Sequence, residues 1–178
     1  MKNEIRNKLK TKRKYLGEIV RLEADRAILE TFLNAFSKHE SFFIYNSFST
    51  EARTDWIIEE LIKAGKRVYL PRVEGKDIVA VPYCGGGLKK GAFGIMEPEG
   101  QAYSGDIEIS VVPLLAVNSR GFRIGYGGGF YDRYLRGKNT QKVGMGYAFQ
   151  LEEFNEEPHD VPLDKYVCER GIYNFGKQ

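Results

Sequence analysis

The sequence predicts a three-layer α/β domain, in which helices flank a mostly parallel sheet. Two observations support this fold class. Residues 41–84 read as strand, helix and strand in succession, an order typical of parallel sheets covered by helices. Residues 111–136 then read as an apolar strand, a glycine-dense loop and a helix. A chain of 178 residues suits one compact domain, so we expect a single α/β domain over residues 1–178.

The composition excludes several classes of protein. Hydrophobic residues make up 42% and charged residues 29% of the chain, fractions that are ordinary for a soluble protein. No apolar run is long enough to span a bilayer, and no apolar stretch follows the basic N-terminus as in a secretory signal. Cys84 and Cys168 are too few for a disulfide framework and lack metal-ligand spacing. We therefore expect a cytoplasmic protein without a membrane partner.

Charge is distributed unevenly around the net value of +3. Residues 1–14 hold seven basic residues against Glu4, whereas residues 152–164 hold six carboxylates and neither Lys nor Arg. Such runs are usually solvated faces. A nucleic-acid-binding protein would need a broader basic surface, so we expect no nucleic-acid partner.

Residues 2–36 have helical periodicity, which predicts two helices or one helix bent around Gly17. The apolar stripe of its first part is formed by Ile5, Leu9, Leu16 and Val20. Lys2, Arg6 and Arg13 fall on the same side as this stripe. Two interpretations remain open: the cations pack their stems and expose their heads, or they reach into a cleft that holds an anion.

The next segment alternates between strands and a helix. An aromatic strand is expected at residues 41–48, followed by a helix at 56–64 for which Thr54 is the expected N-cap. Strands follow at residues 66–73 and 78–84. Two more strands are expected near the C-terminus, at residues 142–148 and, as an edge strand, at residues 166–175.

In open α/β sheets, ligands bind beyond the carboxyl ends of the strands. This rule predicts that Glu51, Pro71, Arg72, residues 118–130 and the turn after residues 142–148 lie on one rim. We therefore expect a binding site there.

The loop at the centre of that rim, RIGYGGGFYDR at residues 123–133, has the composition of a phosphate site. Its glycines are Gly125, Gly127, Gly128 and Gly129. Such a density of glycine is costly unless the backbone must go where side chains cannot. Unpaired amides at a helix start bind anions, and Arg123 and Arg133 add positive charge. Asp132 could hold a metal ion bound to a phosphate.

Two common phosphate loops are excluded. The dinucleotide pattern G-x-G-x-x-G fails because Phe130 stands where the third glycine belongs, and the Walker A pattern fails because no Lys-Ser/Thr pair follows the glycines. A flexible connection without a ligand remains the alternative at this point.

Six segments, taken in order, resemble the 5-formyltetrahydrofolate cyclo-ligase family, also called methenyltetrahydrofolate synthetases. The sharpest is the loop at residues 123–133, which is similar to the family's nucleotide loop. The other five are Lys2-x-x-x-Arg6, Glu51-x-x-Thr54, Pro71-Arg72, Gly94-Ile95-x-Glu97-Pro98 and His159-Asp160-x-Pro162-x-Asp164. The resemblance covers nearly the whole chain and implies the three-layer fold.

The resemblance implies ATP-driven closure of 5-formyltetrahydrofolate to 5,10-methenyltetrahydrofolate, with ADP and phosphate released through a phosphorylated formyl group. It implies Mg²⁺ and the co-substrate ATP, in a protein that we expect to be a monomer. Arg123 and Asp132 would be catalytic, and Asp132 and Asp160 would hold the metal. Residues expected to bind ATP are Lys2, Arg6, Arg123, Gly125, Gly127, Gly128, Gly129, Tyr131 and Asp132, and those expected to bind the folate are Glu51, Thr54 and Tyr131.

The chain departs from the family pattern at two positions. Asn118 stands where the family commonly has Asp, which puts a metal or base role there in doubt, and Phe130 replaces the first of two tyrosines. Three other hypotheses remain: a non-catalytic folate- or nucleotide-binding relative, a nucleic-acid module using the basic helix, and a phosphosugar isomerase. The retained cations and carboxylates argue against the first, and the lack of a base-stacking motif argues against the second.

Overall fold

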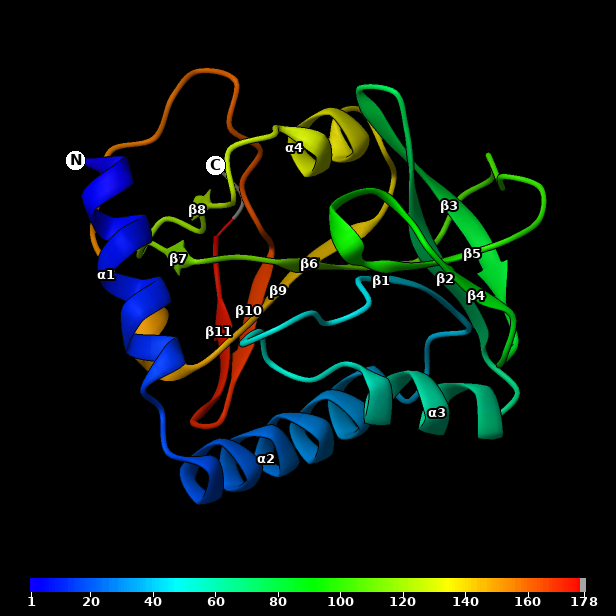
Figure 1. The fold of residues 1–178 in the computed structure, drawn as a ribbon, viewed down its shortest axis with the longest axis horizontal. Helices are drawn as coiled ribbons and strands as arrows, with labels where there is room; N and C mark the ends of the chain where they lie inside the picture. The colour runs from blue at the N-terminus through cyan, green and yellow to red at the C-terminus, as the bar shows by residue number, and fades with distance from the viewer. Residues whose placement is uncertain (177–178) are drawn as a thin grey trace.

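The protein contains one large sheet, seen in a computed structural model that describes residues 1–176. Its strands are β1 (Ser41–Ile44), β2 (Arg67–Glu74), β3 (Asp77–Tyr83), β6 (Ile109–Pro113), β9 (Gln141–Met145), β10 (Lys165–Cys168) and β11 (Gly171–Asn174). They are ordered β11-β10-β9-β6-β1-β2-β3 (Figure 1). Neighbours from β10 to β2 pair in parallel, and β11 and β3 pair antiparallel at the edges. The predicted mostly parallel sheet is confirmed.

Helices cover both faces of this sheet (Figure 1). The helices are α1 (Lys2–Lys14), α2 (Glu18–Phe36), α3 (Asp55–Lys63) and α4 (Phe130–Leu135), with short 3₁₀ turns η1 (Ala92–Gly94) and η2 (Ala148–Gln150). Two small strand pairs complete the fold: β4 (Leu88–Lys90) with β5 (Met96–Pro98), and β7 (Ala116–Val117) with β8 (Arg123–Ile124). α2 and α3 lie on one face, α4 lies on the other, and α1 crosses one end of the molecule. The predicted three-layer α/β architecture is confirmed.

Alternation along the strands builds the two apolar layers. Phe42 and Ile44 of β1 join the core that contains the buried side chains of α2 and α3, whereas Phe43 joins residues that pack with α4. Val111 and Val112 of β6 divide between the two faces in the same way. Side chains with period two therefore bury both faces, which is why these strands read as nearly continuous apolar runs.

The first two helices are separate and meet at Gly17, the N-cap of α2. Leu9 is fully buried on α1, as its stripe predicts. The prediction for Val20 was wrong, since its side chain is 55% exposed. Because α2 is a separate helix that begins at Glu18, the apolar stripe of α1 does not extend to Val20. None of the helices in residues 1–176 is long and apolar enough to cross a membrane.

Four predicted strands are shorter or divided, including the one expected at residues 142–148, since β9 ends at Met145. β1 ends at Ile44 rather than at residue 48, because the Thr54 hydroxyl donates to the Tyr45 carbonyl (2.7 Å) and accepts from the Ser47 amide (2.9 Å), which turns the chain out of the sheet. Thr54 occupies the N-cap position but its side chain makes no cap bond. Residues 111–117 divide between β6 and β7 after Pro113, and residues 166–175 form the β10–β11 hairpin instead of one edge strand.

The strand order places a crevice beside β1. The chain passes from β1 to β2 on one side and later returns to β6 on the other side of β1. Connections that leave a parallel sheet in opposite directions open a space beyond the carboxyl ends of the two strands. This is where the predicted rim residues gather.

Candidate active site

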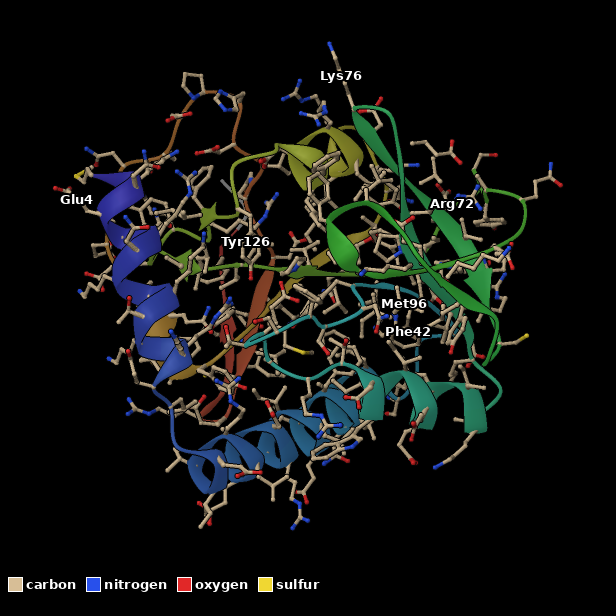
Figure 2. All side chains as sticks on the ribbon, viewed as in Figure 1. Glu4, Phe42, Arg72, Lys76, Met96 and Tyr126 are labelled. Atoms are coloured by element: carbon tan, nitrogen blue, oxygen red, sulfur yellow. The ribbon has the colours of Figure 1, made fainter. Side chains whose placement is uncertain are left out.

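A cavity of about 1130 Å³ lies at this crevice, with Tyr45 and Asn46 after β1 and Pro113 of β6 in its wall. Its other walls include α1, the glycine loop at residues 125–129, the start of α4 and the side chains of Glu157, His159 and Asp160. Figure 2 labels Tyr126 of the glycine loop between α1 and the middle of the molecule. All but one of the predicted site residues line the cavity: Lys2, Arg6, Glu51, Arg123, Gly125, Gly127, Gly128, Gly129, Tyr131, Asp132 and Asp160.

Thr54 is the exception. It is fully buried, and its hydroxyl is used by the chain between β1 and α3, so it does not contact the cavity and the predicted direct folate contact is wrong. Arg72 does not line the cavity either, whereas its neighbour Pro71 does. Its guanidinium binds Glu74 and the Gly100 carbonyl, on the opposite side of the molecule from Tyr126 (Figure 2).

Residues 125–129 form the glycine loop. Gly127 has φ +105° and Gly129, the N-cap of α4, has φ +67°, conformations that side chains with a Cβ rarely adopt. Arg6 Nε donates to the Gly125 carbonyl (2.9 Å), and Arg133 Nη2 donates to the Gly128 carbonyl (2.9 Å). No residue in the described part of the chain accepts a hydrogen bond from the amides of Gly127 and Gly128, so both donors are free for a ligand.

The charge at the loop comes from side chains more than from the helix. α4 has only six residues, so its dipole contributes less than the sequence suggested. Arg133 does not line the cavity and instead pairs with Asp77 at 3.1 Å, so its predicted contribution to the anion site is wrong. Arg6, Arg123 and Lys2 supply the positive charge.

Arg123 and Asp132 form a buried pair across the loop. Arg123 is 7% exposed; its Nη2 donates to Asp132 Oδ1 at 2.9 Å, and its Nη1 donates to the Val161 carbonyl at 3.0 Å. The Val161 amide donates to the same oxygen of Asp132 at 3.1 Å. These bonds fix Asp132 through Oδ1, and no other described residue bonds Oδ2.

Lys2 holds Asp160 beside this pair. Its Nζ lies 3.0 Å from Asp160 Oδ2 and 3.2 Å from Glu157 Oε1. Although burial opposes the charge, the Glu157 amide and Lys2 lower the pKa of Asp160, which keeps it ionised. Asp132 and Asp160 thus each have one oxygen tied to the protein.

The donor set fits a Mg²⁺ ion, which takes one or two carboxylates together with substrate phosphates. Glu157, His159 and Asp160 also lie together, with ligand atoms within 4.8 Å of one another. A histidine is a poor ligand for Mg²⁺, so this three-residue group as a whole does not fit that ion.

Glu51 stands on a different wall, on the loop after β1. Its Oε2 accepts the Phe48 amide at 2.8 Å. Burial raises the pKa of this carboxyl, while the Phe48 amide, the Tyr126 hydroxyl and Arg13 act in the opposite direction. Sequence reasoning placed Arg13 on the inward stripe but did not assign it to the site, and it missed Tyr126.

Aromatic side chains form the outer rim near Glu51. Phe93 is 71% exposed and Phe48 is 48% exposed, and both line the cavity. Phe93 has φ +59°, an uncommon conformation for a side chain of this size, and its ring meets Phe130 edge to face at 6.0 Å. Sequence reasoning missed Phe48 and Phe93, because an exposed aromatic in a loop has no periodic signal.

Asn118 lies outside the cavity and organises the β7–β8 turn. Its Oδ1 accepts the amides of Arg120 (3.1 Å) and Phe122 (2.9 Å), and its Nδ2 donates to the Phe154 carbonyl at 3.1 Å. The amide donor is used in a bond that a carboxylate could not make, so the residue here has a turn-forming role.

Comparison with known proteins gives one family. A sequence model described as the 5-formyltetrahydrofolate cyclo-ligase family matches residues 1–169. The 5-formyltetrahydrofolate cyclo-ligase of Escherichia coli K12 is 32% identical over 151 residues, covering 74% of this chain and 79% of that protein. The Haemophilus influenzae enzyme of the same name is 28% identical over 181 residues, covering 91% and 94%. The solved structure of Aquifex aeolicus 5,10-methenyltetrahydrofolate synthetase superposes with a TM-score of 0.89 and 31% identity, covering 99% of this chain and 94% of that one.

Proposed function

Because the chain belongs to the 5-formyltetrahydrofolate cyclo-ligase family, we propose that this enzyme uses MgATP to close 5-formyltetrahydrofolate to 5,10-methenyltetrahydrofolate. The observation that carries the proposal is that one cavity is lined by two kinds of groups, which we call its triphosphate half and its folate half. Cations, free loop amides and two carboxylates line one half, and Glu51 with exposed aromatic rings lines the other. A triphosphate and a flat heterocycle with N–H donors need these two environments side by side.

The triphosphate half is formed by the glycine loop and three cations. The amides of Gly127 and Gly128 would donate to phosphate oxygens, and Lys2, Arg6 and Arg123 would neutralise their charge. Tyr131, whose pKa is raised well above its usual value by burial, stays a neutral phenol at the boundary with the folate half. Phosphoryl transfer depends mainly on such positioning and charge neutralisation.

Asp132 and Asp160 would hold the Mg²⁺ ion, which, when bound, neutralises charge on the phosphates. Arg123 pairs with Asp132 and Lys2 pairs with Asp160, which holds both carboxylates in place.

The folate half is formed by Glu51 and the rim. The ionised carboxylate of Glu51 would accept hydrogen bonds from N–H groups of the folate, and Phe48, Phe93 and Tyr131 would pack on its rings. Flat rings gain from offset or edge contacts with aromatic side chains.

The chemistry follows from the poor leaving ability of a formamide oxygen. The formyl oxygen attacks the γ-phosphorus of ATP and ADP departs, which leaves the formyl oxygen phosphorylated and its carbon still bonded to N5. N10 then attacks this carbon and loses its proton. The carbon–oxygen bond breaks, and phosphate leaves with the former formyl oxygen. The protein's part is to hold the formyl oxygen in line with the γ-phosphate and to exclude water.

We also propose that the protein acts as a monomer in the cytoplasm and without nucleic acid. Residues of this chain from Met1 to Asp160 line the cavity. Two cations of α1 bind other parts of the chain, since Arg6 donates to the glycine loop and Lys8 pairs with Glu152 at 2.8 Å.

The test is an activity assay of the wild type and of Asp132→Asn. Each protein is mixed with 5-formyltetrahydrofolate and ATP, and formation of the product is monitored by its near-ultraviolet absorbance. The rise should require both ATP and Mg²⁺ in the wild type. The Asn variant can still accept from Arg123 and Val161, so it should fold normally and lose roughly 100-fold or more in kcat. A flat wild-type trace from folded protein would refute the activity, and near-normal turnover of the variant would refute the role of Asp132.

A further inference from the structure

Three residues connect α1, the glycine loop and the loop after β1 in one chain of contacts, which we call the Arg13–Tyr126–Glu51 chain. All three line the cavity. They stand between the two halves described above, and neither binding triphosphate nor contacting a metal explains why Arg13 and Tyr126 are there.

Arg13 is the fixed end of this chain. Its side chain is 3% exposed, although it lies at the C-terminal end of a helix whose neighbouring lysines are in solvent. Nη1 donates to the Leu114 carbonyl at 3.3 Å, and Nη2 donates to the Tyr126 hydroxyl at 2.8 Å. Nε is buried without a hydrogen-bond partner among the described residues. A buried cation in this state needs a nearby negative charge to offset its desolvation.

Tyr126 lies between Arg13 and Glu51. Its ring is 47% exposed, but its hydroxyl lies inside, between Arg13 and Glu51. Since the phenol oxygen accepts from Arg13, its own proton is available to the neighbouring carboxylate of Glu51, whose ionised form it favours. Burial and the charge of Glu51 raise the pKa of Tyr126 well above its usual value, so the phenol remains a donor at every working pH.

Glu51 is the last residue of the Arg13–Tyr126–Glu51 chain. It is faced by Arg13 from α1, by Tyr126 from the glycine loop, by Tyr131 from α4 and by Tyr45 from the end of β1. Of these, Arg13 is the cation and Tyr126 is the side-chain donor that favour its ionised form. The Phe48 amide supplies the remaining bond and fixes the loop.

We propose that Arg13 and Tyr126 are positioning residues for the folate half of the reaction, which hold the carboxylate of Glu51 ionised and aimed at the N–H groups of the substrate. This inference rests on the proposed function. It adds that the glycine loop serves both substrates: its amides meet the triphosphate, while Tyr126 within the same loop supports the folate contact. A loop ordered by ATP would thereby also order Glu51.

The experiment compares Tyr126→Phe with the wild type and with Tyr134→Phe. The Phe variant keeps the ring and removes only the hydroxyl between Arg13 and Glu51. Tyr134 is a matched control, because it is a partly buried tyrosine of α4 that packs on Phe43 and does not line the cavity. The expected result is a KM for 5-formyltetrahydrofolate raised roughly three- to tenfold in Tyr126→Phe, with the KM for MgATP unchanged.

The pH profile separates positioning from a merely structural role. Without the Tyr126 hydroxyl, the ionised form of Glu51 loses a hydrogen bond and its pKa rises further. The acid limb of kcat/KM for the folate should move to higher pH in Tyr126→Phe and stay in place in Tyr134→Phe. Arg13→Lys, which keeps the positive charge, should show a smaller displacement than Arg13→Met. If both Arg13 variants fail to fold, Tyr126→Phe decides the question.

A wild-type folate KM and acid limb in Tyr126→Phe would overturn the inference, as would an equal rise in the KM of both substrates. A ligand-free measurement keeps this result distinct from a failure of the proposed function. The carboxyl ¹³C shift of Glu51 in labelled protein should titrate at higher pH in Tyr126→Phe than in the wild type. An unchanged titration contradicts the contact even if turnover is absent, whereas absent turnover with a displaced titration contradicts only the assigned reaction.

Discussion

At the scale of single residues, the site shifts the pKa values of two carboxyl groups in opposite directions. Asp160 is kept ionised by the Glu157 amide and Lys2, against the effect of burial. For Glu51, burial prevails over the Phe48 amide, Tyr126 and Arg13, and its pKa is raised. A raised pKa means that the folded protein binds a proton more tightly than the unfolded chain. The ionised Glu51 that a folate needs therefore lowers the stability of the fold.

Glu51→Gln should separate function from stability. The folded pKa of Glu51 lies above the unfolded value, about 4.3, so its stabilising contribution is present below that value and is lost as pH rises through the folded pKa. Gln does not titrate. The variant should therefore be at least as stable as the wild type at neutral pH, with an advantage that shrinks as the pH falls toward 4. Urea unfolding of both proteins between pH 4 and pH 8 measures the difference.

The same variant should bind 5-formyltetrahydrofolate at least tenfold more weakly, because a donor replaces one carboxylate acceptor, while its affinity for ATP should be kept. Titration calorimetry with each substrate tests this. A defect confined to ATP would remove Glu51 from the folate half.

At the scale of elements, the cavity depends on segments that have little regular structure of their own. The glycine loop is held by Arg6 from α1 and by Arg133 from α4, and residues 157–160 are held by Lys2. α1 itself packs through Ile5 and Leu9 on the β7–β8 hairpin and Phe154. The helix therefore positions both the loop and the acidic segment, which explains why its cations lie on its inward side.

Gly127→Ala tests the loop, and Gly85→Ala is its matched control. Gly127 has φ +105° and Gly85 has φ +102°, and a Cβ would meet no atom within 4 Å at either position. Each substitution should therefore lower the free energy of unfolding by a similar amount, about 1–2 kcal/mol. Only Gly127→Ala should weaken ATP binding, because only Gly127 lines the cavity. Equal ATP affinity of the two variants would show that the loop does not hold the triphosphate.

At the scale of the whole molecule, the sequence predicted the sheet type, the layers and most walls of the site. Strand–helix–strand order and apolar runs were sufficient for the fold, because both are local signals of elements buried on both faces. The failures arose where tertiary contacts override local pattern. The Thr54 hydroxyl ends β1 early, and Arg133 leaves the loop's ligand side to pair with Asp77.

The site residues that sequence reasoning missed share one property. Tyr126 and Phe48 lie in loops and Phe93 lies in the short 3₁₀ turn η1, where neither helical nor strand periodicity marks a side chain that faces a cavity. The sequence pattern identified Arg13 as a cation on the inward stripe of a helix. Its hydrogen-bond partner Tyr126, however, is 113 positions away in the sequence. Only the folded structure brings such residues together.

Isotope transfer measures whether the formyl oxygen is activated by phosphorylation in this cavity. 5-Formyltetrahydrofolate labelled with ¹⁸O in its formyl group would be turned over with unlabelled MgATP in unlabelled water. We expect the label in the released inorganic phosphate, one atom for each product formed. Label released into water, with unlabelled phosphate, would contradict the phosphorylated intermediate and with it the arrangement of the two halves.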